Sequence, residues 1–390
     1  MQNCGDSMST HIHPSDRCSL TFLCTGNGIV TDIDRDNIRA FKLKMFGNVT
    51  RCTFNQMRHA FRHKLEIRSE NIMIHRIVLL AGVQPVKYDC CINFCVAYTG
   101  KYELYENCPF CHQPRFTRDR KVRRSYNYIP LIPRLQAFYQ SQGMIRKLSY
   151  QRHYQHDPGR ICDVFDCSHY RNLLRRKVTI DGIERPYTYF CDGRDIAFGL
   201  SVDGYLLYKR RRGGPSATPV ILQNYNLPPQ VRTHLENLIC LSVIHKPKDL
   251  GSFLVPFDEE RVQLAMGVPT FDASDESLFD LHAFIILEHG DIVAIEEMLG
   301  LKGHNGYCPC RSCKIKGVRN ITDHGKIYYV PLTTPNLEHQ TRPSVNPQSL
   351  RLRTHEHFLS AHERINSATS NKARDAFAKY YGIRHYPLLH

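Results

Sequence analysis

Four cysteines constrain this chain most, because their spacing is that of two pairs of metal ligands. The first pair lies in Cys91-Ile-Asn-Phe-Cys95, and the second lies in Cys108-Pro-Phe-Cys111 after twelve intervening residues. A tight turn lets the two thiolates of a pair converge on one ion, and a second pair completes a tetrahedron. We therefore predict that Cys91, Cys95, Cys108 and Cys111 hold a structural zinc ion.

Cys90 directly precedes Cys91 in this motif. Only one of two adjacent side chains is expected to point toward the ion. The spacing therefore leaves open whether Cys90 or Cys91 is the ligand.

The composition is that of a basic globular protein. The chain has 390 residues, 42% of them hydrophobic, which suffices for two or three domains with their own cores. Lysine and arginine outnumber the acids by 52 to 37, for a formal charge of +15. Such a charge attracts polyanions, so nucleic acid is the expected partner class. The excess gathers in three runs, Arg118–Arg124, Arg171–Lys177 and Lys209–Arg212.

The first and last of these runs also fit nuclear-import patches, so we expect a nuclear protein. The N-terminus is polar and lacks the apolar stretch of a secretion signal, which favours reduced thiols over a disulfide framework for the sixteen cysteines. Short apolar runs such as Ala283–Leu287 are far below the roughly 20 residues needed to cross a bilayer. We expect no membrane association.

Apolar periodicity divides the chain into regions. Helical spacing recurs between 36 and 83, and a further helix is expected over 134–147. Short apolar runs predict strands at 196–202, 218–223, 238–244 and 281–288, with helices near 253–265 and 292–299. Strands interleaved with helices indicate an α/β sheet. The expected division is a leader at 1–35, a helical region at 36–85, a zinc ribbon with a basic linker at 86–125, a connecting region at 126–190, an α/β core at 191–335 with a Cys/His insert at 302–324, and a helical extension at 336–390.

Two acids follow two of the predicted strands. Asp203 comes after 196–202, and Asp291 comes after 281–288. Carboxylates at the ends of neighbouring strands are a natural seat for Mg²⁺ or Mn²⁺, two of which can drive an in-line phosphodiester displacement. Each acid also has a purely structural interpretation: Asp203 begins an Asp-Gly turn, and Asp291 is a candidate helix N-cap.

A second cysteine group lies shortly after Asp291. It contains Cys308, Cys310 and Cys313, with His304 just before them and His324 after them. Cys310 and Cys313 are the best ligand pair, and His304 would extend the set. We predict a possible second zinc site here, with free thiols in a loop as the alternative.

Several strings in this order resemble the transposases of CACTA-type (En/Spm) DNA transposons, in the form found in mushroom-forming fungi. They span residues 55–335 and include Tyr88–Cys95, Cys108–Cys111, Tyr128–Ala137, His156–Pro158, Asp163–Asp166, Asp195–Gly204, Asn224–Pro229, Phe271–Ala273 and Lys302–Cys313.

The resemblance implies a DDE/D recombinase with a ribonuclease-H-like mixed sheet flanked by helices, cutting and joining DNA with two magnesium ions. Asp203 matches the family's first catalytic acid and Asp291 its second, although Val202, Tyr205, Leu207 and Val293 depart from the surrounding motifs. The family's third acid follows a segment that here is Tyr381–Leu389, so we expect a C-terminally truncated chain without it. Glu356 and Glu363 do not stand in the third acid's context.

Two functions follow from these observations. The first is a transposase or transposase-derived nuclease, impaired by the missing acid and acting on transposon ends, with a homo-oligomer possible. The second is a catalytically inactive zinc-containing DNA-binding remnant or domesticated regulator. Either one would contact DNA phosphates through basic side chains, for which the candidates are Arg134, Lys147, Lys209, Arg210, Arg211 and Arg212.

Overall fold

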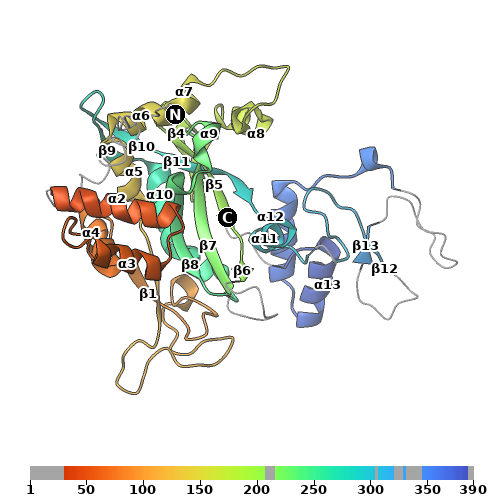
Figure 1. The fold of residues 1–390 in the computed structure, drawn as a ribbon. Helices are drawn as coiled ribbons and strands as arrows, with labels where there is room; N and C mark the ends of the chain where they lie inside the picture. Colours follow the sequence, from red (N-terminus) through yellow and green to blue (C-terminus); the bar gives the residue numbers. More distant parts are fainter. Residues whose placement is uncertain (1–29, 207–215, 304–305, 320–327, 331–344, 385–390) are drawn as a thin grey trace, which may run out of the picture.

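The computed structural model describes residues 30–206, 216–303, 306–319, 328–330 and 345–384. Most of the leader expected at 1–35 lies outside these residues, as do the basic run Lys209–Arg212 and the histidines His304 and His324. The described part of the chain is a mixed α/β protein built around one central sheet (Figure 1).

Three helices form the N-terminal unit, in the stretch where the helical spacing between 36 and 83 predicts two or three. They are α2 (Asp32–Phe46), α3 (Arg51–Ala60) and α4 (Glu70–Ala81). Thr31 begins α2 with a capping box and Thr50 caps α3, so side-chain oxygens satisfy N–H groups that a helix start leaves without partners. Gly82 ends α4 at a φ of 65°, in the left-handed region that glycine adopts without a steric cost.

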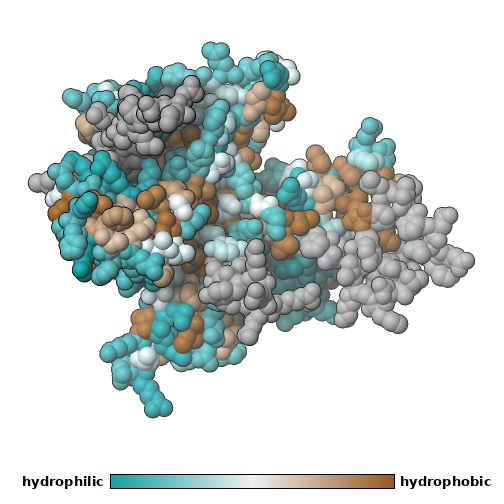
Figure 2. All heavy atoms as spheres, viewed as in Figure 1, coloured by the Kyte–Doolittle hydropathy of each residue, from teal (hydrophilic) through white to brown (hydrophobic). Residues whose placement is uncertain are grey.

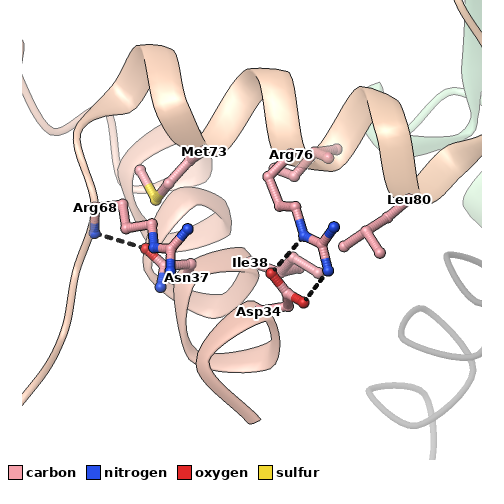
Figure 3. Close-up of a pocket in the computed structure, with 8 residues that line it drawn as sticks. Asp34, Asn37, Ile38, Arg68, Met73, Arg76 and Leu80 are labelled. Carbon is pink, nitrogen blue, oxygen red and sulfur yellow. Dashed lines mark hydrogen bonds and ion pairs between the residues drawn. The ribbon is translucent and has the colours of Figure 1, made fainter. Parts of the chain in front are cut away.

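Polar side chains lock α2 against α4 (Figure 3). The guanidinium of Arg76 donates to both carboxylate oxygens of Asp34, at 2.9 and 2.8 Å, and this pairing lowers the pKa of Asp34 well below its ordinary range. Asn37 donates to the carbonyls of Ile33 and Glu66 and accepts from the N–H of Arg68. Asp34 and Asn37 are both buried, and their partners are therefore part of what holds this small unit together.

A hairpin of two strands carries the cysteine motif. Strand β1 (Val86–Asp89) pairs antiparallel with β2 (Ser125–Tyr128), and the chain between them, which includes the short 3-10 helix η2 (Gly100–Tyr102), forms a separate lobe (Figure 1). The tip of this lobe is hydrophilic (Figure 2). We call residues 86–128 the cysteine lobe.

The connecting region is mostly short helices. The prediction of a single helix over 134–147 is wrong. Two helices occupy this stretch, because the helix is interrupted at Ser141, which caps the second one. The elements here are α5 (Ile132–Phe138), α6 (Gln142–Leu148), α7 (Tyr150–His153), η3 (Val164–Asp166), α8 (Ser168–Leu173) and the hairpin β3 (Lys177–Ile180)–β4 (Ile183–Thr188). Asp181 and Gly182 both have positive φ, as a tight hairpin turn requires.

The central sheet has the strand order β11–β5–β7–β8. Strands β5 (Ile196–Val202), β7 (Ser216–Asn224) and β8 (Leu238–Ile244) form an antiparallel meander, and β11 (Ala283–His289) lies parallel to β5. The two-residue β6 (Tyr205–Leu206) continues the course of β5 along β7. All four strands predicted from apolar runs are confirmed, with ends shifted by at most a few residues.

The remaining core elements join these strands. Helix α9 (Pro229–Arg232) and η4 (Leu235–Asn237) lead into β8, and α10 (Leu250–Met266) and the hairpin β9 (Val268–Asp272)–β10 (Ser277–Leu281) lead into β11. Glu260 of α10 accepts from the backbone N–H groups of Leu131 and Ile132 and from the hydroxyl of Tyr128, so α10 caps the start of α5.

Both faces of the sheet are buried. Ile196, Phe198 and Leu200 of β5 belong to the larger apolar cluster, which includes Phe253 and Phe257 of α10. The opposite face packs in a second cluster of aromatic and aliphatic side chains, Phe165, Tyr170, Val178, Ile180, Phe190, Ala197, Tyr225, Phe284 and Ile286. A strand buried on both faces is typical of an α/β sheet. Burial on both faces requires mostly apolar side chains, so the apolar run of β5 predicts a strand from the sequence alone.

The C-terminal part lies on the other side of the sheet from α2–α4 (Figure 1). It contains α11 (Ile292–Met298), β12 (Val318–Arg319), β13 (Tyr328–Tyr329), η5 (Pro347–Ser349), α12 (His355–Asn366) and α13 (Asn371–Tyr381). A small core of its own joins Leu301 to Ala361, Ile365, Ala378 and Ile383. Among the described residues, no helix is long and apolar enough to span a bilayer.

Candidate metal centre and acidic cavity

The cysteine lobe gathers four thiols. The ligand atoms of Cys91, Cys95, Cys108 and Cys111 all lie within 4.8 Å of one another, and the Sγ atoms of Cys91 and Cys111 are 3.3 Å apart. Cys91, Cys95 and Cys108 are buried, and Cys111 is half-buried. A closed set of four convergent sulfur atoms is the donor set of structural zinc, so the residues present fit the predicted ion.

The fold shows which of the two adjacent cysteines, Cys90 or Cys91, lies with the other thiols. Cys91 is in the four-thiol cluster, whereas Cys90 packs in the main core beside the sheet. Burial raises the pKa of the Cys90 thiol to about 12, as expected for a thiol that serves as a small apolar side chain.

Local turns aim the four sulfur atoms. The N–H of Asn93 points at the Sγ of Cys91, at 3.4 Å, and Phe94 completes that turn at a φ of 55°. Burial raises the pKa of Cys95, and neighbouring thiols raise it further. Four thiolates this close would repel one another without a cation, so zinc binding has to release protons.

The cysteine lobe is fastened to the start of α10. The N–H groups of Lys248 and Asp249 both donate to the carbonyl of Cys95, at 2.9 and 3.0 Å. The carboxylate of Asp249 accepts from the Tyr102 hydroxyl and pairs with Lys101, each at 2.9 Å. These contacts tie the cysteine site to the residues that lead into α10, a core helix.

The two predicted acids lie just beyond the ends of two adjacent parallel strands, β5 and β11. Ser201 of β5 is the register partner of His289 of β11. Asp203 lies two residues after Ser201, and Asp291 lies two residues after His289. Because β5 and β11 run in the same direction, both acids emerge at the same edge of the sheet.

A cavity of about 330 Å³ lies at this edge, and both acids line it. Asp203 is exposed in the gap between β5 and β6. Asp291 is the N-cap of α11, as its alternative interpretation anticipated: its Oδ1 accepts from the N–H of Ala294 at 2.7 Å. One carboxylate oxygen of Asp291 is thus engaged by the helix, and the geometry leaves Oδ2 for another partner.

Two further charged residues line the same cavity, and neither belongs to a motif of the sequence. Glu297 lies on α11 six residues after Asp291, and Lys246 follows β8. Glu297 is exposed. Neither residue has a sequence signal of its own, because only the sheet brings the end of β8 beside α11. Glu356 and Glu363 belong to α12 and do not line this cavity.

Close packing fixes the end of β11 against β5. A Cβ atom at Gly199 would lie 2.3 Å from Nε2 of His289, so the central strand needs glycine at this position. The hydroxyl of Tyr225 hydrogen-bonds the same Nε2. Burial lowers the pKa of His289. A neutral, packed His289 holds the chain two residues before Asp291.

The second cysteine group is only partly described. The Sγ of Cys310 accepts from the N–H groups of Ser312 and Cys313, both at 3.4 Å, which is a turn of the ligand-bearing kind. The guanidinium of Arg353 binds the carbonyls of Cys308, Cys310 and Cys313, and thus ties this turn to the helical extension. Within the residues that the structure covers, these cysteines do not form a set of three close ligands, and His304 lies outside them.

The proposed phosphate contacts differ in their surroundings. Burial lowers the pKa of Arg134 to about 10, and its guanidinium donates to the carbonyls of Ile129, Pro130 and Cys240. Arg134 therefore joins α5 to β8. Lys147 of α6 is half-buried and lines, with Arg134, a cavity of about 800 Å³ between α2 and β8. Lys209, Arg210, Arg211 and Arg212 lie outside the described residues.

One more ligand-like group appears at the opposite end of β5. Cys191, Asp195 and His282 have ligand atoms within 4.8 Å of one another. Asp195 is fully buried and already has two partners, the Nδ1 of His282 at 3.1 Å and the N–H of Asp192 at 3.1 Å. This pair fastens the entry to β5 to the entry to β11.

Comparison with known proteins gives one result. Residues 178–350 match the sequence model of the transposase family tnp2, and this stretch contains the whole central sheet, both acids and the second cysteine group. The match supports a transposase family for this part of the chain. No curated protein matches the chain.

Proposed function

We propose that this protein is a DDE/D-type DNA transposase that binds transposon-end DNA and cuts and joins phosphodiester bonds in the cavity between β5, β8 and α11. The observation that carries this proposal is the placement of Asp203 and Asp291 just beyond the ends of two adjacent parallel strands, on the wall of one cavity. The tnp2 match and the formal charge of +15 support DNA as the substrate.

The topology supports a ribonuclease-H-like core. A three-strand meander is followed by the long helix α10 and by a fourth strand parallel to the first, which gives a mixed sheet with helices on its faces. The CACTA subgroup and its fungal branch remain part of the proposal, and rest on the motif strings at the cysteine lobe and the central sheet. We place the protein in the nucleus, because the basic runs Arg118–Arg124 and Lys209–Arg212 fit nuclear-import patches.

The cavity is lined by acids that suit metal ions and by a lysine that suits a DNA phosphate. Asp203 and Asp291 offer the hard oxygen ligands that Mg²⁺ or Mn²⁺ prefers, and the bound ions would activate the attacking hydroxyl and neutralise the charge of the phosphate. Lys246, on the same wall, is suited to hold the DNA phosphate. Glu297 presents a third carboxylate to this cavity, and we assign it the place of the third catalytic acid.

A second candidate function is a catalytically inactive zinc-containing DNA-binding protein. One observation favours it: Asp203, Asp291 and Glu297 do not come within ligand distance of one another as a set of three in the described residues. Asp291 is also partly engaged as a helix cap. The cysteine lobe and the formal charge of +15 would serve this function without any change at the cavity.

Nicking of supercoiled plasmid in Mg²⁺ separates the two functions. The transposase proposal predicts that Asp203→Asn and Asp291→Asn each reduce nicking by at least 100-fold, because a lost metal ligand removes transition-state stabilisation. Asp280→Asn is the matched control, since Asp280 is an exposed acid of β10 away from the cavity. Equal nicking by the parent and both cavity variants would favour the inactive DNA-binding protein.

A further inference from the structure

The N-terminal unit has an exposed helix, α3, that contributes no residue to the acidic cavity. Helix α3 follows α2 after only four residues, Gly47 to Thr50, and Asn48 turns the chain there at a φ of 50°. Two helices joined by a short turn are the framework of the helix-turn-helix, in which the second helix enters the major groove of DNA.

Only one side chain of α3 is buried, that of Phe54. The side away from Phe54 is polar and exposed, and presents Asn55, Gln56 and His59, with Arg62 two residues after the helix. Arginine, asparagine and glutamine are the side chains that make paired hydrogen bonds to base edges in the major groove. The helix thus has the side-chain types of a base-reading surface.

The charge around α3 matches the same partner. Residues 51–68 contain five lysines and arginines (51, 58, 62, 64 and 68) and one acid, Glu66. A surface hollow of about 390 Å³ next to the helix is lined by Arg58, His59 and Arg62, with Glu66 as the one acid among its walls. A positive, acid-poor surface is complementary to the DNA backbone rather than to a second copy of this basic chain.

Two arginine side chains connect α3 to the segment that follows it and to α4. The Nε of Arg58 donates to the carbonyl of Ile67 at 2.9 Å, and Arg51 reaches Glu70 of α4 at 2.9 Å. Together with the Asp34–Arg76 pair between α2 and α4, these contacts connect the three helices beneath the exposed face. Base reading needs such support, because a side chain has to be held within a fraction of an ångström of its target.

We propose that α3 is a recognition helix that reads the base sequence of duplex DNA in the major groove through Asn55, Gln56 and Arg62. This inference deepens the proposed function by naming the part of the chain that selects the DNA. It rests on DNA being the substrate, but it does not require the acidic cavity to be active.

The test is selection of bound duplexes from a random 30-base-pair library by the full-length, zinc-loaded protein. Affinity for the selected duplex and for random duplex is then measured by fluorescence anisotropy at several salt concentrations. We expect the selected duplex to lose at least 10-fold in affinity with the variant Asn55→Ala/Gln56→Ala/Arg62→Ala, and random duplex to change much less. Lys372→Ala/Arg374→Ala is the control, since it removes two exposed basic side chains of α13.

Circular dichroism confirms that the variants are folded. Failure of the library to enrich any sequence, or equal affinity of the triple variant for the enriched duplex, would overturn the inference. The cavity variants Asp203→Asn and Asp291→Asn distinguish the two proposals: they abolish nicking if the proposed function is right, and they keep the selected DNA preference if α3 supplies it.

Discussion

At the scale of single residues, neighbours in the sequence have separate roles that only the fold distinguishes. Cys90 and Cys91 are adjacent, yet one packs in the core and the other joins the four thiols. Arg134 looks like a phosphate contact by its charge, but three backbone carbonyls surround its guanidinium. Adjacent or isolated polar residues carry no periodicity, so the sequence alone does not assign their direction.

The four-thiol cluster predicts a specific loss of metal. Cys108→Ser/Cys111→Ser should bind one zinc ion fewer per chain than the parent, because serine cannot replace a thiolate as a zinc ligand. Zinc content after gel filtration, measured by atomic emission, checks this. The control Cys90→Ser should keep its zinc, and loss of zinc from the control alone would reverse the assignment of Cys91 and Cys90.

Glu297 predicts a second effect at the cavity. Glu297→Gln keeps the size of the side chain and removes its charge, so nicking in Mg²⁺ should fall by about 10-fold or more while DNA binding is retained. Glu296, its buried neighbour on α11, is unsuitable as a control because its carboxylate is part of the core. Glu276→Gln, in the exposed turn between β9 and β10, is the matched variant. Unchanged nicking by Glu297→Gln would remove Glu297 from the site.

At the scale of elements, apolar runs in the sequence predict the strands and helices of the core. Strands β5, β7, β8 and β11 and helices α10 and α11 lie where the sequence predicts them, because burial on one or both faces imposes a pattern on the side chains. The prediction of one helix over 134–147 is wrong, because the feature that interrupts the helix leaves the apolar pattern unchanged. The break at Ser141 depends on a local cap, which interrupts the backbone without changing the apolar pattern.

The α2–α4 pair predicts how the N-terminal unit responds to mutation and pH. Asp34→Asn removes a charge that Arg76 binds through two hydrogen bonds, and should cost about 1.5–3 kcal/mol in the free energy of unfolding. The pKa of Asp34 is lowered in the folded state by this pairing. Its contribution is therefore complete above the ordinary aspartate pKa of about 4 and is lost as the pH falls below it.

Urea unfolding of the parent and of Asp34→Asn, at pH 7 and pH 3, measures this effect. The difference in stability between the two proteins should shrink at the lower pH. Asp36→Asn is the control, because Asp36 makes an exposed pair with Arg39 on the same helix. A difference that is equal at both pH values would contradict the role of the Asp34 charge.

At the scale of the whole molecule, the sheet brings residues that are distant in the sequence to one cavity. Asp203 and Asp291 are far apart in the chain, and their position at one edge depends on the parallel register of β5 and β11. The sequence predicted that both acids follow strands, which places them at strand ends. It could not predict that Lys246 and Glu297 join them, because those positions depend on how β8 and α11 pack at the same edge.

Metal-directed cleavage of the chain tests the central claim, that Asp203 and Asp291 share one ion-binding edge. Fe²⁺ bound there in place of Mg²⁺, with ascorbate and peroxide, generates radicals that cut the nearby backbone. Fragments should end near both residue 203 and residue 291, and either Asp203→Asn or Asp291→Asn should abolish both cuts. Cleavage near only one acid, or cuts that persist in both variants, would contradict it.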